Sequence, residues 1–216
     1  MNPQSSDWNN FWANRCHGQI GKISWSKRRI IKVIEPFLKD KRAALDAGCG
    51  SGFFSKYFCD LGLNTVSLDY SEKALGITQA STNGRSKIVK SDLLNDPLDQ
   101  KIKERFDVIF SDGLLEHFAV HEQNKIFENF KSVLLTHGRI ITFVPNKWSP
   151  WELIRPLFMP GIDEKPFVIN ELIRLNVNNG LTVISTGGIN ICPFRFSPDR
   201  LLGHQFGMLL YTIAKK

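Results

Sequence analysis

Short runs of apolar residues alternate along the chain with stretches in which apolar residues recur every three or four positions. Strands are predicted at residues 43–47, 64–68, 86–90, 106–111, 138–144 and 181–185, and the near-continuous apolar run at 106–111 is typical of a strand covered on both faces. The periodic stretches predict helices, at residues 24–38, 52–61, 71–81, 120–135 and 167–179. Residues 207–214 are a candidate closing strand. This alternation predicts an α/β fold: a doubly wound, mostly parallel seven-stranded sheet with helices on both faces.

Two stretches fall outside the alternation. Near the start, Trp8, Phe11 and Trp12 recur at helical spacing, so residues 1–40 are expected to form an N-terminal helical cap. Residues 147–166 carry large apolar side chains between several prolines, and prolines break long helices. We expect this second stretch either to form a lid-like insertion after the fifth strand or to pack on the edge of the sheet.

Length and composition suit one α/β domain, because 216 residues with 42% hydrophobic content can bury a sizeable core. We expect residues 1–216 to form it, as the cap (1–40), a core (41–146), the insertion (147–166) and the C-terminal part of the sheet (167–216). No apolar run is long enough to span a membrane, and the N-terminus lacks the apolar core of a signal peptide. Four scattered cysteines without a C-x-x-C pair are typical of reduced thiols in a cytoplasmic protein.

The formal net charge is +7, and basic residues gather at 27–29, 39–42 and 101–105. These groups do not form one stripe. They are either solvated surfaces or sites that attract an anionic substrate, RNA or an anionic membrane surface. No recognisable RNA-binding module accompanies them, and no DNA partner is expected. The sequence leaves the oligomeric state open.

The strongest chemical signal follows the first predicted strand, where Asp46 precedes Gly48, Gly50 and Gly52. Glycines let the backbone turn tightly from strand to helix and let a ligand approach it closely. Dinucleotide folds favour the spacing G-x-G-x-x-G and place a pyrophosphate over the helix N-terminus. Here the spacing is G-x-G-x-G, and a carboxylate before it suits a cation better than an anion.

This stretch resembles the cofactor loop of the class I S-adenosylmethionine (SAM)-dependent methyltransferases, in which an acid, one residue and G-x-G-x-G bind the cofactor. The resemblance implies that the core at 41–146 binds SAM and releases S-adenosylhomocysteine (SAH). It assigns the loop residues to the cofactor: Asp46, Gly48, Cys49, Gly50, Gly52 and Phe53. Cys49 is otherwise simply a small residue that fits the turn.

Two further acids follow the second and third strands. Asp69 stands about twenty residues after the glycine loop, where a carboxylate can accept hydrogen bonds from both ribose hydroxyls. NAD-binding folds share that spacing, and Asp69 could instead cap the next helix. By resemblance, Asp92 accepts the adenine amine and Leu93 packs on the ring, although Asp92 could be a simple loop acid. Tyr70 is placed to stack on the adenine or to cover the core.

The fourth strand ends in Ser111-Asp112, followed by Glu116 and His117. In the family this turn lies beside the methionine part of the cofactor and faces the acceptor, so Ser111 and Asp112 are expected on the cofactor side. His117, with Glu116 beside it, is the candidate general base, because the ordinary pKa of histidine lies near neutrality. The alternative is a structural histidine. Some relatives bind a metal through such a pair, and here Asp112, Glu116, His117 and His121 are the candidate ligands. Residues four apart among them would share a face if this stretch is helical. Gly113 stands where those relatives have a glutamate, so no metal is expected.

The resulting expectation is a SAM-dependent methyltransferase (EC 2.1.1.-) for a small, hydrophobic or aromatic acceptor, with O- or C-methylation, similar to the ubiquinone-pathway enzymes. The tryptophan-rich insertion favours that acceptor, and peripheral membrane contact fits it. The alternatives are an RNA or protein methyltransferase that uses the basic groups, a non-catalytic relative that binds without reaction, and an NAD-dependent oxidoreductase. An oxidoreductase would be expected to show the spacing G-x-G-x-x-G and a catalytic Tyr/Lys or Cys/His set, and the sequence shows neither.

Overall fold

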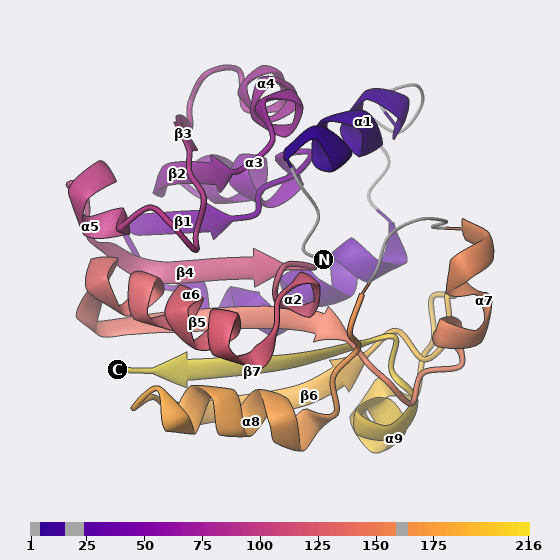
Figure 1. Ribbon diagram of the computed structural model, residues 1–216. Coiled ribbons are helices and arrows are strands. Elements are labelled where there is room, and N and C mark those ends of the chain that lie inside the picture. The colour runs from indigo at the N-terminus through magenta and orange to yellow at the C-terminus, as the bar shows by residue number, and fades with distance from the viewer. Residues whose placement is uncertain (1–4, 16–23, 159–163) are drawn as a thin grey trace.

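The computed structural model describes residues 5–15, 24–158 and 164–216 of the chain, and Figure 1 draws the remaining residues as a grey trace. In the described part, seven strands form one sheet in the order β3-β2-β1-β4-β5-β7-β6. The strands are β1 (Ala43–Ala47), β2 (Asn64–Asp69), β3 (Lys87–Lys90), β4 (Phe106–Asp112), β5 (Leu134–Pro145), β6 (Thr182–Ile189) and β7 (Leu209–Lys215). The first five pair in parallel, whereas β7 runs antiparallel to both β5 and β6. The predicted mostly parallel, seven-stranded α/β fold is confirmed.

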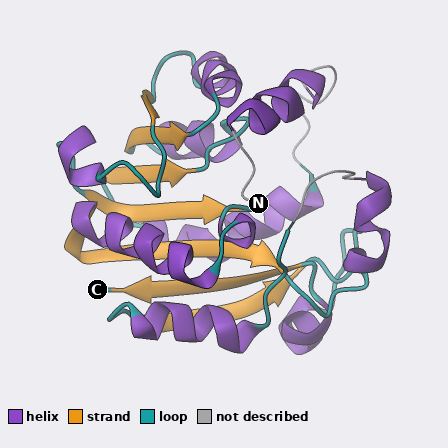
Figure 2. Ribbon diagram, in the orientation of Figure 1, coloured by secondary structure: helices purple, strands orange, loops and turns teal. Residues whose placement is uncertain are grey.

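Helices cover both faces of this sheet. The longer ones are α1 (Ser5–Arg15), α2 (Trp25–Leu38), α4 (Glu72–Ser81), α6 (Val120–Val133) and α8 (Ile169–Asn178). The shorter ones are α3 (Phe53–Asp60), α5 (Leu98–Lys101), α7 (Trp151–Phe158), α9 (Asp199–Phe206) and the 3-10 turn η1 (Leu115–His117). Figure 1 shows α6 and α8 in front of the sheet and α2 behind it, and Figure 2 shows the same layers by element type. None of the described helices is long and apolar enough to cross a membrane.

The core consists of two apolar clusters separated by the sheet. The apolar run of β4 alternates between them, because successive strand residues point to opposite faces. Ile109 joins the cluster under α6 and α8, whereas Val108 and Phe110 join the cluster under α2 and α3. All three side chains have 0% exposure. A fully apolar strand in the sequence is therefore a central strand that packs on both sides.

Polar caps fix where two of these helices begin. The Ser24 Oγ accepts a hydrogen bond from the Lys27 amide at 3.2 Å, and the Ser71 Oγ accepts one from the Ala74 amide at the same distance. Such N-caps satisfy amides that the first helical turn leaves unpaired. The predicted starts of α2 and α4 are confirmed. Gly180, with φ +74°, follows the C-cap residue Asn179 of α8.

Several predicted boundaries are wrong. Strand β5 begins at Leu134, which pairs with Phe106, so α6 ends before residue 134. Helix α8 begins at Ile169, because Phe167 forms a β-bridge with Asn146. Prolines do not break the insertion completely, since α7 runs from Trp151 to Phe158 through Pro156. The sequence also did not predict α5, α9 or η1.

Some predictions concern residues outside the described part of the chain. Residues 159–163 of the expected insertion lie there, as does Cys16. The division of 1–216 into cap, core, insertion and C-terminal part stays a prediction. Cys49, Cys59 and Cys192 are free thiols, as the cysteine spacing predicts.

Candidate functional site

The glycine loop leaves the carboxyl end of β1 and is shaped by left-handed backbone. Gly48, Gly50 and Gly52 have φ values of +71°, +51° and +73°. The Gly48 and Cys49 amides donate to the Leu68 carbonyl at 2.8 and 3.0 Å, which ties the loop to the end of β2. A Cβ on Gly52 would lie 2.7 Å from the Thr78 Cα of α4. Only glycine allows both this conformation and this close packing of the next helix.

Asp69 ends β2 and faces that loop. Its Oδ2 accepts a hydrogen bond from the Gly50 amide at 3.0 Å, and its Oδ1 accepts one from the Ser71 amide at 2.8 Å. Burial raises the pKa of the Asp69 carboxyl group, and the backbone amides oppose that rise. Each carboxylate oxygen has a second lone pair, so the fixed carboxylate can still accept two hydroxyl groups of a ligand. Asp69 is not the N-cap of the next helix, α4, because Ser71 occupies that position.

Asp46 is buried at the end of β1, with 3% of its surface exposed. The Ser55 Oγ donates to its Oδ2 at 2.5 Å, and the Ser67 Oγ donates to Ser55 at 2.7 Å. Burial raises the pKa of Asp46 to about 7, and the charges of Asp112 and Asp69 add to this rise. An acid held in this way gains from a nearby cation, because the cation favours its ionised form.

The end of β4 adds a second acid, the partly buried Asp112, whose charge acts on Asp46. Burial raises the pKa of Asp112 to about 6, and the Lys27 ammonium opposes the rise. Burial in turn lowers the pKa of Lys27, whose Nζ lies 4.2 Å from the centre of the Phe53 ring. Ser111, with 1% exposure, donates to the Thr142 hydroxyl at 3.4 Å. Lys27, at the start of α2, belongs to the basic group at 27–29, and the structure places its charge close enough to act on Asp112.

Glu116 and His117 lie in η1 and meet Glu164 from the far end of the insertion. One ligand atom from each lies within 4.8 Å of the others, which is the spacing of a candidate metal site. Burial raises the pKa of Glu116 well above its usual value, and nearby carboxylates add to the rise. Its Oε2 is buried and has no hydrogen-bond partner in the described part of the chain. His121 is not in this group. Asp112 lies in β4, Glu116 and His117 lie in η1 and His121 lies in α6, so neither pair of residues four apart shares one helical face.

The insertion reaches this cluster through a buried ion pair. In α7 the Arg155 Nε lies 3.1 Å from the Glu152 carboxylate, and its Nη1 lies 3.4 Å from Glu164. The Lys165 amide donates to the Glu116 carbonyl at 2.8 Å. The segment after strand five therefore packs against η1, which follows β4. No pattern in the sequence predicts that Glu164 or Arg155 lies there.

Helix α1 covers the same end of the sheet. The Trp8 ring meets the His117 ring edge-on, with centroids 4.8 Å apart. A Cβ on Gly50 would lie 2.5 Å from the Trp12 indole, so Trp12 stands directly against the glycine loop. The Ser71 Oγ donates to the Asn9 Oδ1 at 2.7 Å, which anchors α1 to the start of α4. The helix predicted from the spacing of the N-terminal aromatic residues is therefore present as α1, and it lies over the candidate site.

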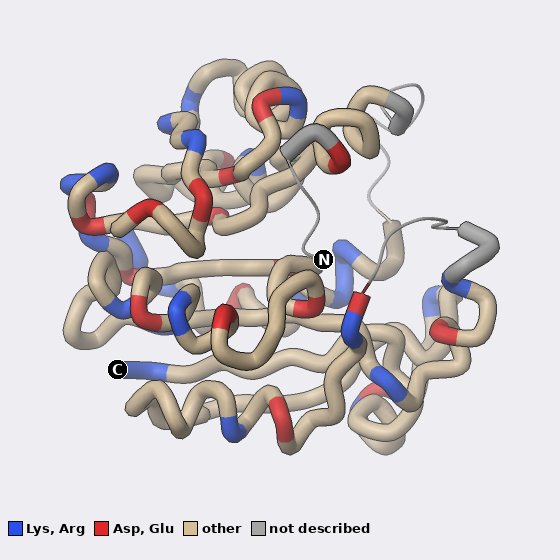
Figure 3. The backbone as a smooth tube through the Cα atoms, in the orientation of Figure 1, with Lys and Arg blue, Asp and Glu red and all other residues tan. Residues whose placement is uncertain are grey.

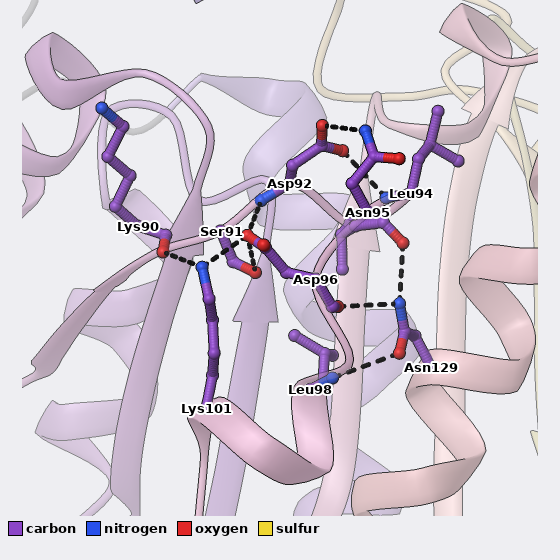
Figure 4. A network of polar contacts seen from close by, with 10 residues as sticks. Lys90, Ser91, Asp92, Leu94, Asn95, Asp96, Leu98, Lys101 and Asn129 are labelled. Carbon is purple, nitrogen blue, oxygen red and sulfur yellow. Dashed lines mark hydrogen bonds and ion pairs between the residues drawn. The ribbon is translucent and has the colours of Figure 1, made fainter.

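Asp92 and Leu93 lie in the loop that follows β3. Polar contacts hold this loop, and those of Asp92 are drawn in Figure 4. The Asp92 carboxylate accepts hydrogen bonds from the Leu94 amide at 2.9 Å and from the Asn95 Nδ2 at 2.7 Å. From α6, the Asn129 Nδ2 donates to the Leu93 carbonyl at 2.7 Å. Asp92 thus makes the contacts of the loop acid, and the Leu93 side chain packs in the core with 6% exposure. No pattern in the sequence predicts the hydrogen bond from Asn129 to this loop.

The residues on which the first resemblance rests match a family model. Residues 45–142 match the model of the methyltransferase domain, from the middle of β1 to β5. The chain carries a methyltransferase domain. No curated protein matches the sequence of the whole chain.

Solved methyltransferases share the fold of the domain at low sequence identity. Magnesium protoporphyrin IX methyltransferase from Synechocystis, solved with bound SAH, is 16% identical with a TM-score of 0.69, and the match covers 98% of each chain. The N-methyltransferase NodS from Bradyrhizobium japonicum, also with SAH, is 13% identical with a TM-score of 0.69, over 97% of this chain and 98% of that one. A SAM-dependent methyltransferase from Archaeoglobus fulgidus is 20% identical with a TM-score of 0.70, over 88% and 92%.

In this domain the carboxyl ends of β1, β2 and β4 bring most of the predicted cofactor residues to one edge of the sheet. The glycine loop, Asp46, Asp69 and Asp112 meet there, and α1 lies over them. The assigned roles of these residues stay predictions. The basic group at 27–29 lies at the start of α2, whereas the groups at 39–42 and 101–105 both precede the paired strands β1 and β4 (Figure 3).

Proposed function

We propose that the protein transfers a methyl group from SAM to a small acceptor and releases SAH. The cofactor is SAM, because the domain belongs to the methyltransferases and because similar folds have been solved with SAH. The observation that carries the proposal is the fixed Asp69 carboxylate, which faces a loop of bare backbone. That arrangement suits a ribose between a carboxylate and glycines.

The charges around the loop suit a cationic donor better than a pyrophosphate. Asp46 and Asp112 have raised pKa values because burial disfavours their ionised forms. A sulfonium group bound beside them would favour ionisation and would be stabilised in return. An anionic cofactor would meet these carboxylates at a cost, which disfavours the oxidoreductase reading.

Methyl transfer itself asks for alignment more than for reactive side chains. The sulfonium already makes the methyl group electrophilic, so holding donor and acceptor in line and away from water supplies most of the acceleration. In this proposal His117 removes the acceptor proton where one must leave, with Glu116 beside it. The Trp8 ring packs edge-on against the His117 imidazole, with ring centroids 4.8 Å apart, and so restricts the orientation of the imidazole.

The acceptor we propose is a hydrophobic or aromatic metabolite methylated on oxygen or carbon. The aromatic rings of α1 support this choice, because Trp8 offers a flat apolar surface against His117. The apolar, tryptophan-rich composition of the insertion supports it as well. An RNA or protein acceptor has no observation of its own beyond the net charge of +7. No metal is required in this scheme, although Glu116, His117 and Glu164 could hold one.

Calorimetry with SAM, SAH and NADH tests the cofactor. We expect heat with the first two and none with NADH, and silence with both SAM and SAH would refute the proposal. Incubation with labelled SAM and a metabolite extract, followed by mass spectrometry, tests the acceptor class. Turnover after treatment with a chelator tests the metal, since a lost activity that added metal restores would overturn the metal-free scheme.

A further inference from the structure

Large apolar side chains stand in solvent on α7, on α9 and on the loops beside them. The five most exposed are Trp148 at 63%, Leu153 at 85%, Phe194 at 70%, Phe196 at 83% and Leu201 at 83%. We call these five residues the apolar face. Figure 1 shows α7 and α9 at the same end of the molecule, which is also the end where the strands of the candidate site terminate. Scattered single exposures are ordinary, but a group of this size marks an interaction surface.

The loop that carries Phe194 and Phe196 is held by a polar framework. Arg29 of α2 donates to the Asn190 Oδ1 at 2.9 Å, to the Cys192 carbonyl at 2.8 Å and to the Phe194 carbonyl. The Arg29 Nε also lies 3.4 Å from the Asp199 carboxylate. The two phenyl rings are thus presented to solvent by a fixed backbone.

Helix α9, which carries Leu201, is also fixed. A Cβ on Gly203 would lie 2.0 Å from the Gly188 carbonyl oxygen of β6, so the helix packs directly on the strand. The buried Asn146 at the end of β5 donates to the Gly207 carbonyl at 2.9 Å and accepts from the Trp148 amide at 3.1 Å. Asn146 therefore links the end of α9 to the segment that carries Trp148.

The charges of the same segments have a clear sign. The exposed ones described there are all basic: Lys147, Lys165, Arg195 and Arg200. The acidic ones are largely buried and paired with arginine: Glu152, Glu164 and Asp199. Exposed aromatic and aliphatic tips among basic side chains are the composition of a surface that binds anionic lipid.

We propose that the apolar face binds the surface of an anionic lipid bilayer. The exposed tips enter the boundary between headgroups and acyl chains, while Arg195 and Arg200 contact the anionic headgroups. A second copy of the chain is a poorer occupant, because two-fold symmetry would bring the same basic groups together. Bound in this way, the protein directs the acceptor end of the sheet toward the membrane. The proposal does not depend on methyl transfer.

Flotation with lipid vesicles tests the apolar part. The full chain is expected to float with vesicles of phosphatidylcholine and phosphatidylglycerol, and less with phosphatidylcholine alone or at high salt. The double variant Phe194→Ser, Phe196→Ser should bind the anionic vesicles at least about tenfold more weakly. Val177→Ser on α8 is the matched control, since Val177 is 56% exposed and lies outside the apolar face.

A second pair of variants tests the charges. Arg195→Gln with Arg200→Gln should weaken binding to the anionic vesicles and reduce its salt dependence, whereas Lys125→Gln on α6 should change neither. Thermal melting and SAM calorimetry show that each variant is folded. Wild-type protein that stays with the buffer, or a phenylalanine variant that floats like wild type, would overturn the proposal. So would a wild-type dimer that the phenylalanine substitutions dissociate, because the occupant would then be a second copy.

Discussion

Replacing Asp69 by alanine is the sharpest test of the cofactor site. The carboxylate already accepts amides from Gly50 and Ser71, at 3.0 and 2.8 Å, and offers its remaining lone pairs to a ribose. A hydrogen bond to a charged group contributes about 1.5–3 kcal/mol, so two lost ribose contacts predict about 3 kcal/mol or more. Asp69→Ala should therefore weaken SAM binding by at least about a hundredfold. Isothermal titration calorimetry measures this loss.

Asp107 provides a matched control at the opposite end of the sheet. Its Oδ2 also accepts two backbone amides, from Arg42 at 2.9 Å and Ala43 at 3.1 Å. Asp107→Ala should reduce the free energy of unfolding in urea as Asp69→Ala does, and yet bind SAM normally. This pair of variants separates the loss of a structural acceptor from the loss of a ligand contact.

SAH adds a third comparison, because it has the same ribose but no sulfonium charge. If Asp69 acts on the ribose, Asp69→Ala should weaken SAM and SAH equally. A loss confined to SAM would mean that Asp69 acts through its charge alone. A folded Asp69→Ala protein that binds SAM within about tenfold of wild type would refute the reasoning altogether.

Further outcomes are expected for pH, for His117 and for one glycine contact. Burial raises the pKa of Asp46 to about 7 and that of Asp112 to about 6, so the folded chain holds protons that the unfolded chain has released above its carboxyl pKa near 3.8. The free energy of unfolding without ligand should then fall as pH rises through that window, and Asp46→Asn should reduce the slope in urea titrations. The ratio of the SAH to the SAM dissociation constant should rise over the same pH range, because ionised Asp46 and Asp112 favour the cationic ligand. A ratio that does not change with pH would exclude these acids from the sulfonium site. His117→Ala should lower the turnover number while the SAM dissociation constant stays the same; unchanged turnover would exclude a base there. Gly203→Ala should cost about 3 kcal/mol or more of unfolding free energy, whereas Gly76→Ala, which meets nothing within 4 Å in α4, should stabilise by about 0.5–1 kcal/mol.

Local chemistry made much of the fold predictable. The apolar run of β4, the N-caps Ser24 and Ser71, and the acid before the glycines all act over a few residues, so the sequence displays them directly. The helix α9 was missed for a physical reason. Its leucines stay exposed and its contact with the sheet is a glycine, so no apolar period marks it.

Long-range pairings were not predictable. Lys27 and Asp112 come from elements far apart in the chain, and their mutual effect on pKa appears only once the sheet is assembled. The same holds for Glu164 against Glu116, because a spacing rule for ligands on one helix cannot anticipate a returning segment. The sequence therefore indicated which residues meet at the glycine loop, but not which residues meet Glu116 and His117.

The place of β7 has a consequence for how the chain becomes folded. Strand β6 is made before β7, yet β6 pairs with β7 in the sheet, and β7 also covers the free edge of β5. Until residues 209–215 leave the ribosome, both edges stay open to unwanted pairing with other chains. A cut just before Leu209 should therefore yield protein that aggregates during synthesis, even though every residue of the cofactor loop is already present.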